Sequence, residues 1–104
     1  MKVAYHAEAQ NDFNEIMATL EDISEQHADQ FEKEFQQELS KAQKNPFHFH
    51  RLTNSSNKRR ANIKRYHHHF IYEVDEIANE IRILIIKHDR RHPSYGLNRR
   101  WPEV

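Results

Sequence analysis

Residues 80–88 read EIRILIIKH, and this stretch decides how the chain folds. Its positions 83–86 are all apolar, so both faces of a strand formed here would be covered, which predicts a central strand. Upstream, HFIYEV at 69–74 and RRANIKRY at 59–66 alternate apolar and polar residues with the period of a strand covered on one face. The C-terminal half therefore predicts three consecutive strands, the last of them at the centre of a sheet.

The N-terminal half has the pattern of two helices behind one short strand. KVAY at 2–5 predicts the strand, and apolar residues then recur every three or four positions across 7–23 and again across 28–42. Ser24 is expected to cap the second helix and Pro46 to end it, because proline disfavours a helical residue before it. The order β-α-α-β-β-β predicts an α+β fold in which a helical hairpin packs on a small, largely antiparallel sheet.

The composition is that of one small domain spanning residues 1–104. Cysteine is absent, which excludes a disulfide framework, a thiol nucleophile and cysteine metal ligands. No apolar stretch is long enough to cross a bilayer, and the first residues lack the pattern of a signal peptide. We therefore expect a cytoplasmic protein with no membrane partner and no bound cofactor.

The net charge of zero hides a division between the two halves of the chain. Residues 1–50 carry four basic and ten acidic side chains, a net charge of −6, whereas residues 51–104 carry twelve basic and six acidic ones, a net charge of +6. This asymmetry favours an anionic partner for the C-terminal half. Alternatively, the two halves attract each other within the fold; a basic face can still point outward in that case.

Basic and histidine side chains crowd three segments of the C-terminal half. Antiparallel pairing would bring these segments into one neighbourhood, where cations beside histidine and tyrosine can neutralise phosphates and stack on bases. A solvated sheet face is the alternative interpretation. The side chains are Arg59, Arg60, Lys64 and Arg65 on the first of the three strands, His67, His68 and His69 at the start of the second, and His88, Arg90 and Arg91 after the third.

The histidine triplet raises the question of a metal site. Because consecutive strand residues alternate faces, His67 and His69 would share a face and His68 would lie on the other. No further histidine cluster completes a tetrahedral set around them, so we expect no metal site.

Four short motifs then combine into a known pattern. They are the basic pair at 59–60, Arg65-Tyr66, the IYEV strand at 71–74 and HDRRHPSY at 88–95. Together with the leading strand and the helical hairpin, they resemble the RelE/ParE superfamily of toxins from bacterial type II toxin–antitoxin modules, in the branch often labelled plasmid stabilisation proteins. The resemblance implies that 87–96 is a site at a strand end, and that a cognate antitoxin protein is a partner.

The resemblance also implies roles for the basic and histidine residues, if the chain acts as a metal-independent, ribosome-dependent endoribonuclease that cuts mRNA and so inhibits translation. A second basic residue would be expected at Asn62 and an arginine at His69, so the set of side chains departs from the pattern there. The implied roles are RNA phosphate binding for Arg59, Arg60, Lys64 and Arg65, acid and base catalysis for His69 and His88, transition-state stabilisation for Arg90 or Arg91, and base stacking for Tyr95.

Two other functions fit the same resemblance. ParE-like members inhibit DNA gyrase and need no nuclease residues. A degenerate toxin would fold and bind its antitoxin without acting on the ribosome, on mRNA or on gyrase.

Overall fold

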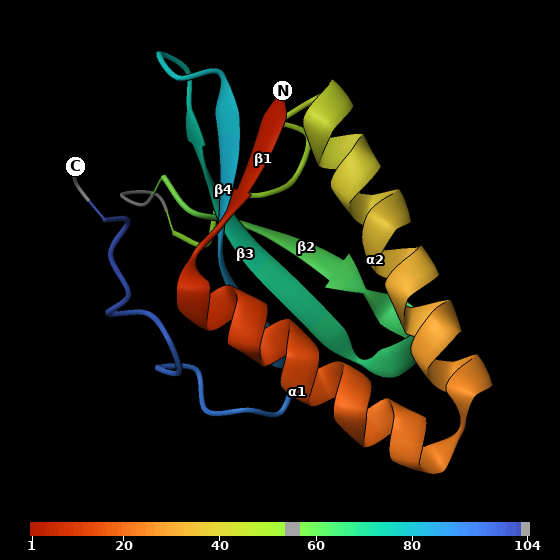
Figure 1. Ribbon diagram of the computed structural model, residues 1–104. Coiled ribbons are helices and arrows are strands. Elements are labelled where there is room, and N and C mark those ends of the chain that lie inside the picture. Colours follow the sequence, from red (N-terminus) through yellow and green to blue (C-terminus); the bar gives the residue numbers. More distant parts are fainter. Residues whose placement is uncertain (54–56, 103–104) are drawn as a thin grey trace.

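The predicted order of elements is confirmed by the computed structural model, which describes residues 1–53 and 57–102. Four strands form one mixed sheet in the order β1-β4-β3-β2, in which β1 runs parallel to β4 and the other neighbours are antiparallel (Figure 1). The elements are β1 Lys2–Tyr5, α1 Ala7–Ile23, α2 Glu25–Lys44, β2 Arg59–Ile63, the 3-10 turn η1 Lys64–Tyr66, β3 His68–Asp75 and β4 Glu80–His88.

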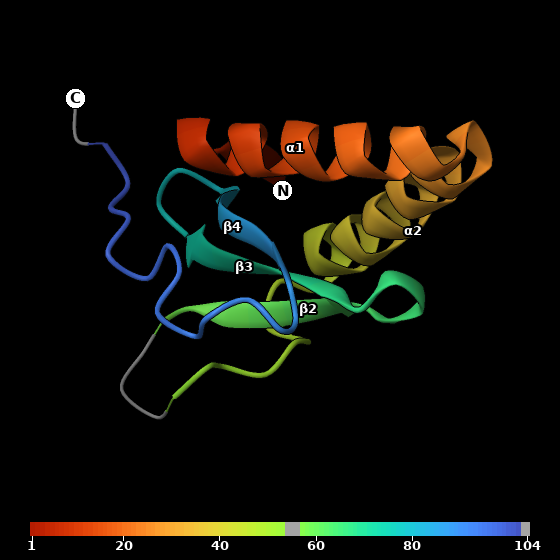
Figure 2. The same ribbon diagram turned by 90° about the horizontal axis from the view of Figure 1, so that it is seen from below.

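The two helices lie on the same side of the sheet (Figures 1 and 2). The side chain of His6 caps α1 by accepting a hydrogen bond from the Glu8 amide. Ser24 caps α2 by accepting from the His27 amide, as predicted, and α2 ends two residues before Pro46. The apolar stripes of both helices face the sheet and pack on its inner face.

A β-bulge in β4 changes which face its side chains occupy. Ile71 of β3 pairs with Ile85, but the next residue, Tyr72, pairs with Ile83, so Leu84 has no opposite residue. Ile83 packs in the core beneath the helices, whereas Leu84 and Ile85 pack in a smaller cluster on the other face. From Ile85 onward, the alternation is therefore out of phase with the first half of the strand.

The strand predicted at 59–66 is shorter than expected. Ile63 pairs with His68, so the chain must reverse direction within the four residues between them. Lys64 and Arg65 therefore lie in the turn η1 instead of on the strand, and His67 completes the reversal in the left-handed region, with φ of 54°.

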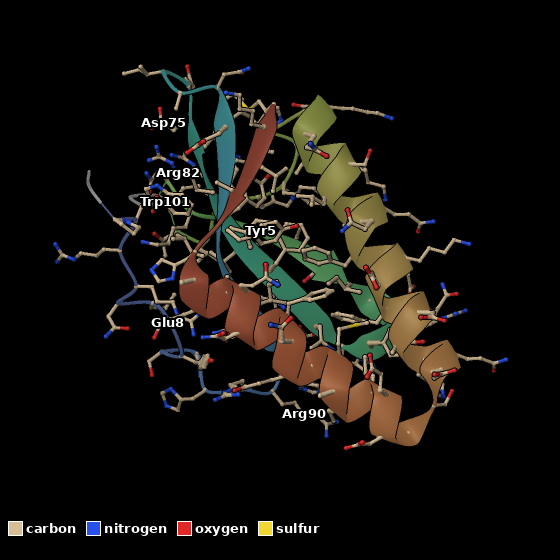
Figure 3. The ribbon with its side chains drawn as sticks, in the orientation of Figure 1. Tyr5, Glu8, Asp75, Arg82, Arg90 and Trp101 are labelled. Atoms are coloured by element: carbon tan, nitrogen blue, oxygen red, sulfur yellow. The ribbon has the colours of Figure 1, made fainter. Side chains whose placement is uncertain are left out.

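The chain beyond β4 folds back over the outer face of the sheet, opposite the helices' face, and along its edge. Trp101 partly covers the outer cluster. The guanidinium carbon of Arg82 lies 5.0 Å from the centre of the Trp101 ring (Figure 3). Arg99 donates hydrogen bonds to the buried carboxylate of Asp12 on α1, at 2.6 and 3.2 Å, and Tyr95 donates to the same carboxylate at 2.6 Å. These contacts make residues 89–102 a structural part of the domain, although the sequence interpretation treats 87–96 mainly as a site.

Gly96 makes this return possible, and we expect Gly96→Ala to destabilise the fold. Its φ of 75° disfavours any side chain, and an added Cβ would lie 2.9 Å from Cγ1 of Ile85. Strain and crowding together should lower the free energy of unfolding by about 1–3 kcal/mol. Urea denaturation followed by circular dichroism measures this, with the exposed Asn98→Ala as control. Equal midpoints for the two variants would contradict the argument.

Candidate functional site

A cavity of about 280 Å³ lies on the outer face of the sheet, where β4 ends. The bulge in β4 turns Lys87 toward this face, and Lys87 pairs with His69 on β3. Asp89 follows β4 directly, and Arg91 follows two residues later. The cavity is lined by the polar side chains of Thr53, Arg60, His69, Lys87, Asp89 and Arg91, together with Leu52, Ile71, Pro93 and Leu97.

The central feature of the cavity is a hydrogen-bonded pair, His69 and Asp89. Nδ1 of His69 lies 2.7 Å from the Asp89 carboxylate, which can only accept, so this nitrogen carries a proton and the neutral ring keeps its lone pair on Nε2. Burial lowers the pKa of His69 below its ordinary value, although the bond to Asp89 acts in the opposite direction. Burial tends to raise the pKa of Asp89, but the bond from His69 and the charge of Arg60 outweigh it. The pair is thus a neutral imidazole oriented by a carboxylate.

Lys87 supplies a buried ammonium group beside this pair. The residue is 5% exposed, and Nζ approaches the carbonyl oxygens of His92, Pro93 and Tyr95 at 3.2–3.5 Å. Burial and the neighbouring guanidinium groups lower the pKa of Lys87. The lysine therefore holds the turn after β4 in place and contributes positive potential to the cavity.

Arg60 brings a second cation to the cavity from β2. Its Nη2 lies 3.4 Å from the Asp89 carboxylate, and its Nε donates to the side chain of Asn62 at 2.9 Å. Asn62 thus orients Arg60, at the position where the resemblance would place a second cation. The guanidinium remains partly exposed, which leaves it accessible to an anion.

The other predicted phosphate-binding residues lie elsewhere. Arg59 donates to the carbonyl oxygens of Phe47 and Phe49, at 3.3 and 2.7 Å, and so anchors the loop after α2. Lys64 and Arg65 lie in the turn between β2 and β3, and Arg65 lines a different cavity, beside α2. The structure therefore brings only Arg60 of these four residues to the cavity of His69.

The histidines also divide between two places. His88 pairs with His68, so both rings point toward the helices, away from His69. His67 lies in the left-handed turn outside β3, so the expectation that it shares a strand face with His69 is wrong. Within residues 1–53 and 57–102, no group of three or more His, Asp or Glu side chains could hold a metal ion.

The structure distinguishes between the two arginines after β4. Arg91 lines the cavity, and its guanidinium lies 3.8 Å from the centre of the Tyr95 ring. Arg90 is exposed and lines neither this cavity nor the one beside α2. Tyr95 is half-buried, with its hydroxyl bonded to Asp12 and Arg99, so it is held more firmly than a stacking side chain on a free tail.

Sequence reasoning missed Lys87, Asp89 and Asp12. A lysine that directly follows the apolar run at 83–86 is a signal of a buried cation, because such a position would otherwise carry an apolar side chain. Asp12 interrupts the apolar stripe of α1 next to Phe13, which is the corresponding signal for a buried carboxylate. The partner of each carboxylate could not be predicted, since 20 residues separate Asp89 from His69 and 87 separate Asp12 from Arg99.

Chemically, this arrangement combines a base with positive charge. A neutral histidine with a free Nε2 can take a proton, and Arg60, Lys87 and Arg91 can stabilise charge that develops on a bound phosphate. The side chain of His69 is only 3% exposed, so a substrate reaches it through the cavity alone.

Comparison with known proteins identifies a family for the chain. Residues 3–93 match the family model described as "ParE toxin of type II toxin-antitoxin system, parDE". A search of curated proteins found no match. In the described part of the chain, neither helix combines the length and apolarity needed to cross a membrane.

Proposed function

The chain belongs to the ParE toxin family of type II toxin–antitoxin systems, and from this premise we propose that it stops translation by cutting mRNA at the His69 cavity. The observation that carries the proposal is the hydrogen-bonded pair of His69 and Asp89, beside Arg60, Lys87 and Arg91. A base held next to converging cations suits phosphodiester cleavage better than a role in binding alone. The reaction would take place in the cytoplasm, on mRNA bound to the ribosome.

In the proposed reaction, the 2′-hydroxyl of RNA attacks the neighbouring phosphorus. Nε2 of His69 takes the proton of the 2′-hydroxyl while the oxygen forms its bond to phosphorus. The bond from phosphorus to the 5′ oxygen then breaks, and this oxygen takes a proton from water. Loss of the proton from His69 to solvent completes the cycle and leaves a 2′,3′-cyclic phosphate and a 5′-hydroxyl end.

The other residues of the cavity have supporting roles. Arg60 and Arg91 bind the phosphate and stabilise its additional negative charge in the transition state. Lys87 adds positive charge to the cavity, and its ammonium group is held in place by the carbonyl oxygens of the turn after β4. Asp89 is a positioning residue: it keeps the proton of His69 on Nδ1, so that Nε2 is the basic atom.

The family membership also implies an antitoxin as a partner. An acidic or amphipathic antitoxin segment would suit the excess of positive charge in residues 51–104. Its binding near the His69 cavity would block access to RNA.

Inhibition of DNA gyrase is the second candidate function. It is favoured by Asn62, which stands where a second strand cation would be expected and leaves Arg60 as the only β2 cation that lines the cavity among the described residues. In that case, the cations of the cavity would contribute to binding a protein, and His69 would be dispensable.

Expression of the chain alone, followed by pulse labelling, tests the proposal. We expect growth to stop and incorporation of amino acids into protein to fall before incorporation of thymidine into DNA. Primer extension should then locate cuts within mRNA. DNA breaks with an SOS response would instead indicate gyrase inhibition. Unimpaired growth at high soluble expression would indicate a toxin that retains only antitoxin binding.

A further inference from the structure

A second cavity, of about 430 Å³, lies on the opposite face of the same strand ends. Ile16 and Leu20 of α1 form its apolar side. Tyr66, His68 and His88 supply three rings, and the two imidazole rings pack edge to face with centres 5.0 Å apart. This volume lies within the usual range of small-ligand sites, and its walls suit a flat aromatic group.

The two histidines have complementary hydrogen-bonding states. Nδ1 of His68 lies 2.6 Å from the carbonyl oxygen of Tyr66, so it donates there and leaves Nε2 as an acceptor. Nδ1 of His88 accepts from the Arg90 amide at 3.0 Å, so the neutral ring carries its proton on Nε2. Within the described parts of the chain, neither Nε2 has a protein partner. The cavity therefore presents one donor and one acceptor beside its apolar wall.

Arg91 connects this cavity to the His69 cavity, because it lines both. A polynucleotide whose phosphate lies at Arg91 can place a nucleotide on either side of the end of β4. We propose that the cavity between α1 and the ends of β3 and β4 is a binding subsite for one RNA base, next to the phosphate bound at the His69 cavity. The proposal rests on the proposed RNA cleavage, and it assigns to His68 and His88 a role in recognition.

The rim of the cavity indicates which bases fit. Glu15 and Thr19 of α1 line the cavity, and both are exposed. The carboxylate of Glu15 can only accept hydrogen bonds, so it favours an exocyclic amino group, which donates, over the exocyclic carbonyl oxygens of uracil, which only accept. It also repels phosphate, which keeps the backbone at Arg91. Adenine, cytosine and guanine should therefore bind better than uracil.

Binding of short oligonucleotides to the full chain tests the subsite separately from cleavage. The probes are 2′-deoxy tetranucleotides of adenine, cytosine or uracil, which lack the attacking hydroxyl, and fluorescence anisotropy gives their affinities. Thr19→Trp should fill the cavity, and Ala18→Trp, an exposed neighbour that does not line it, is the control. Stacking of one base typically contributes about 5- to 150-fold in affinity.

We expect the adenine and cytosine probes to bind at least about fivefold more tightly than the uracil probe. Thr19→Trp should weaken their binding about tenfold, and Glu15→Gln should remove the discrimination against uracil. Ala18→Trp should bind as the wild type does. In NMR spectra, the ring signals of His68 and His88 should shift on addition of the adenine probe, while those of the distant, exposed His50 should not.

Wild-type affinity in Thr19→Trp, or unmoved His68 and His88 signals, would overturn the subsite. The proposed cleavage can fail separately. Thr19-dependent binding without any cutting of mRNA supports the subsite and refutes cleavage. Cutting of mRNA with no base preference beside the cut, and no effect of Thr19→Trp, supports cleavage and refutes the subsite.

Discussion

His69→Gln should abolish toxicity while leaving the protein folded. Removal of a general base typically costs about 10²- to 10⁴-fold in rate, and glutamine can still donate a hydrogen bond to Asp89 from its amide. The measurements are growth after induction and the rate of cutting of a ribosome-bound mRNA by the purified protein. The matched control is His50→Gln, which changes an exposed histidine outside the cavity.

The pH profile separates the loss of a base from simple disruption. The base must be neutral, and burial lowers the pKa of His69, so wild-type activity should be flat from pH 8 to 7 and should fall only at pH values below the ordinary histidine pKa of about 6.5. Asp89→Asn should reduce the rate, because an amide no longer enforces the proton on Nδ1. The pH profile of Asp89→Asn should also differ from that of the wild type. A His69→Gln protein as toxic as the wild type would refute the mechanism and favour gyrase inhibition.

The largest effect on stability is expected for Asp12→Ala. The Asp12 side chain is 5% exposed and that of Arg99 9%, and their closest atoms are 2.6 Å apart. Loss of the carboxylate would leave the Arg99 guanidinium buried without this counter-charge and the Ile86 amide without its acceptor. Removal of one partner from such a pair typically costs about 3–5 kcal/mol. This is a large share of the roughly 5–15 kcal/mol that stabilises a small domain.

Urea denaturation compares Asp12→Ala with Asp22→Ala, an exposed carboxylate on the same helix. The control should change the free energy of unfolding by less than about 0.5 kcal/mol. Tyr95→Phe should cost about 1 kcal/mol, because it removes one hydrogen bond to Asp12 and keeps the ring. Equal midpoints for Asp12→Ala and Asp22→Ala would mean that residues 89–102 are not tied to the domain through α1.

The sequence by itself determined the architecture. Its periodic patterns depend only on neighbouring residues, so they place both helices and the central strand at 80–88, and the Ser24 cap follows from local chemistry. The motifs at 59–60 and 88–95 were sufficient to indicate the family, which the match over residues 3–93 confirms. They also drew attention to the end of β4, where both cavities lie.

Only the tertiary structure decided which of the candidate residues meet. The bulge at Leu84 shifts the phase of β4, so that Lys87 faces outward beside His69 while His88 faces inward beside His68. A strict alternation counted from Ile83 would have assigned the opposite faces. Such a bulge depends on the pairing of two strands and on distant side chains: Arg99 donates to the carbonyl of the unpaired Leu84. Contacts between residues far apart in the sequence leave no periodic signal, and these contacts assemble the candidate site.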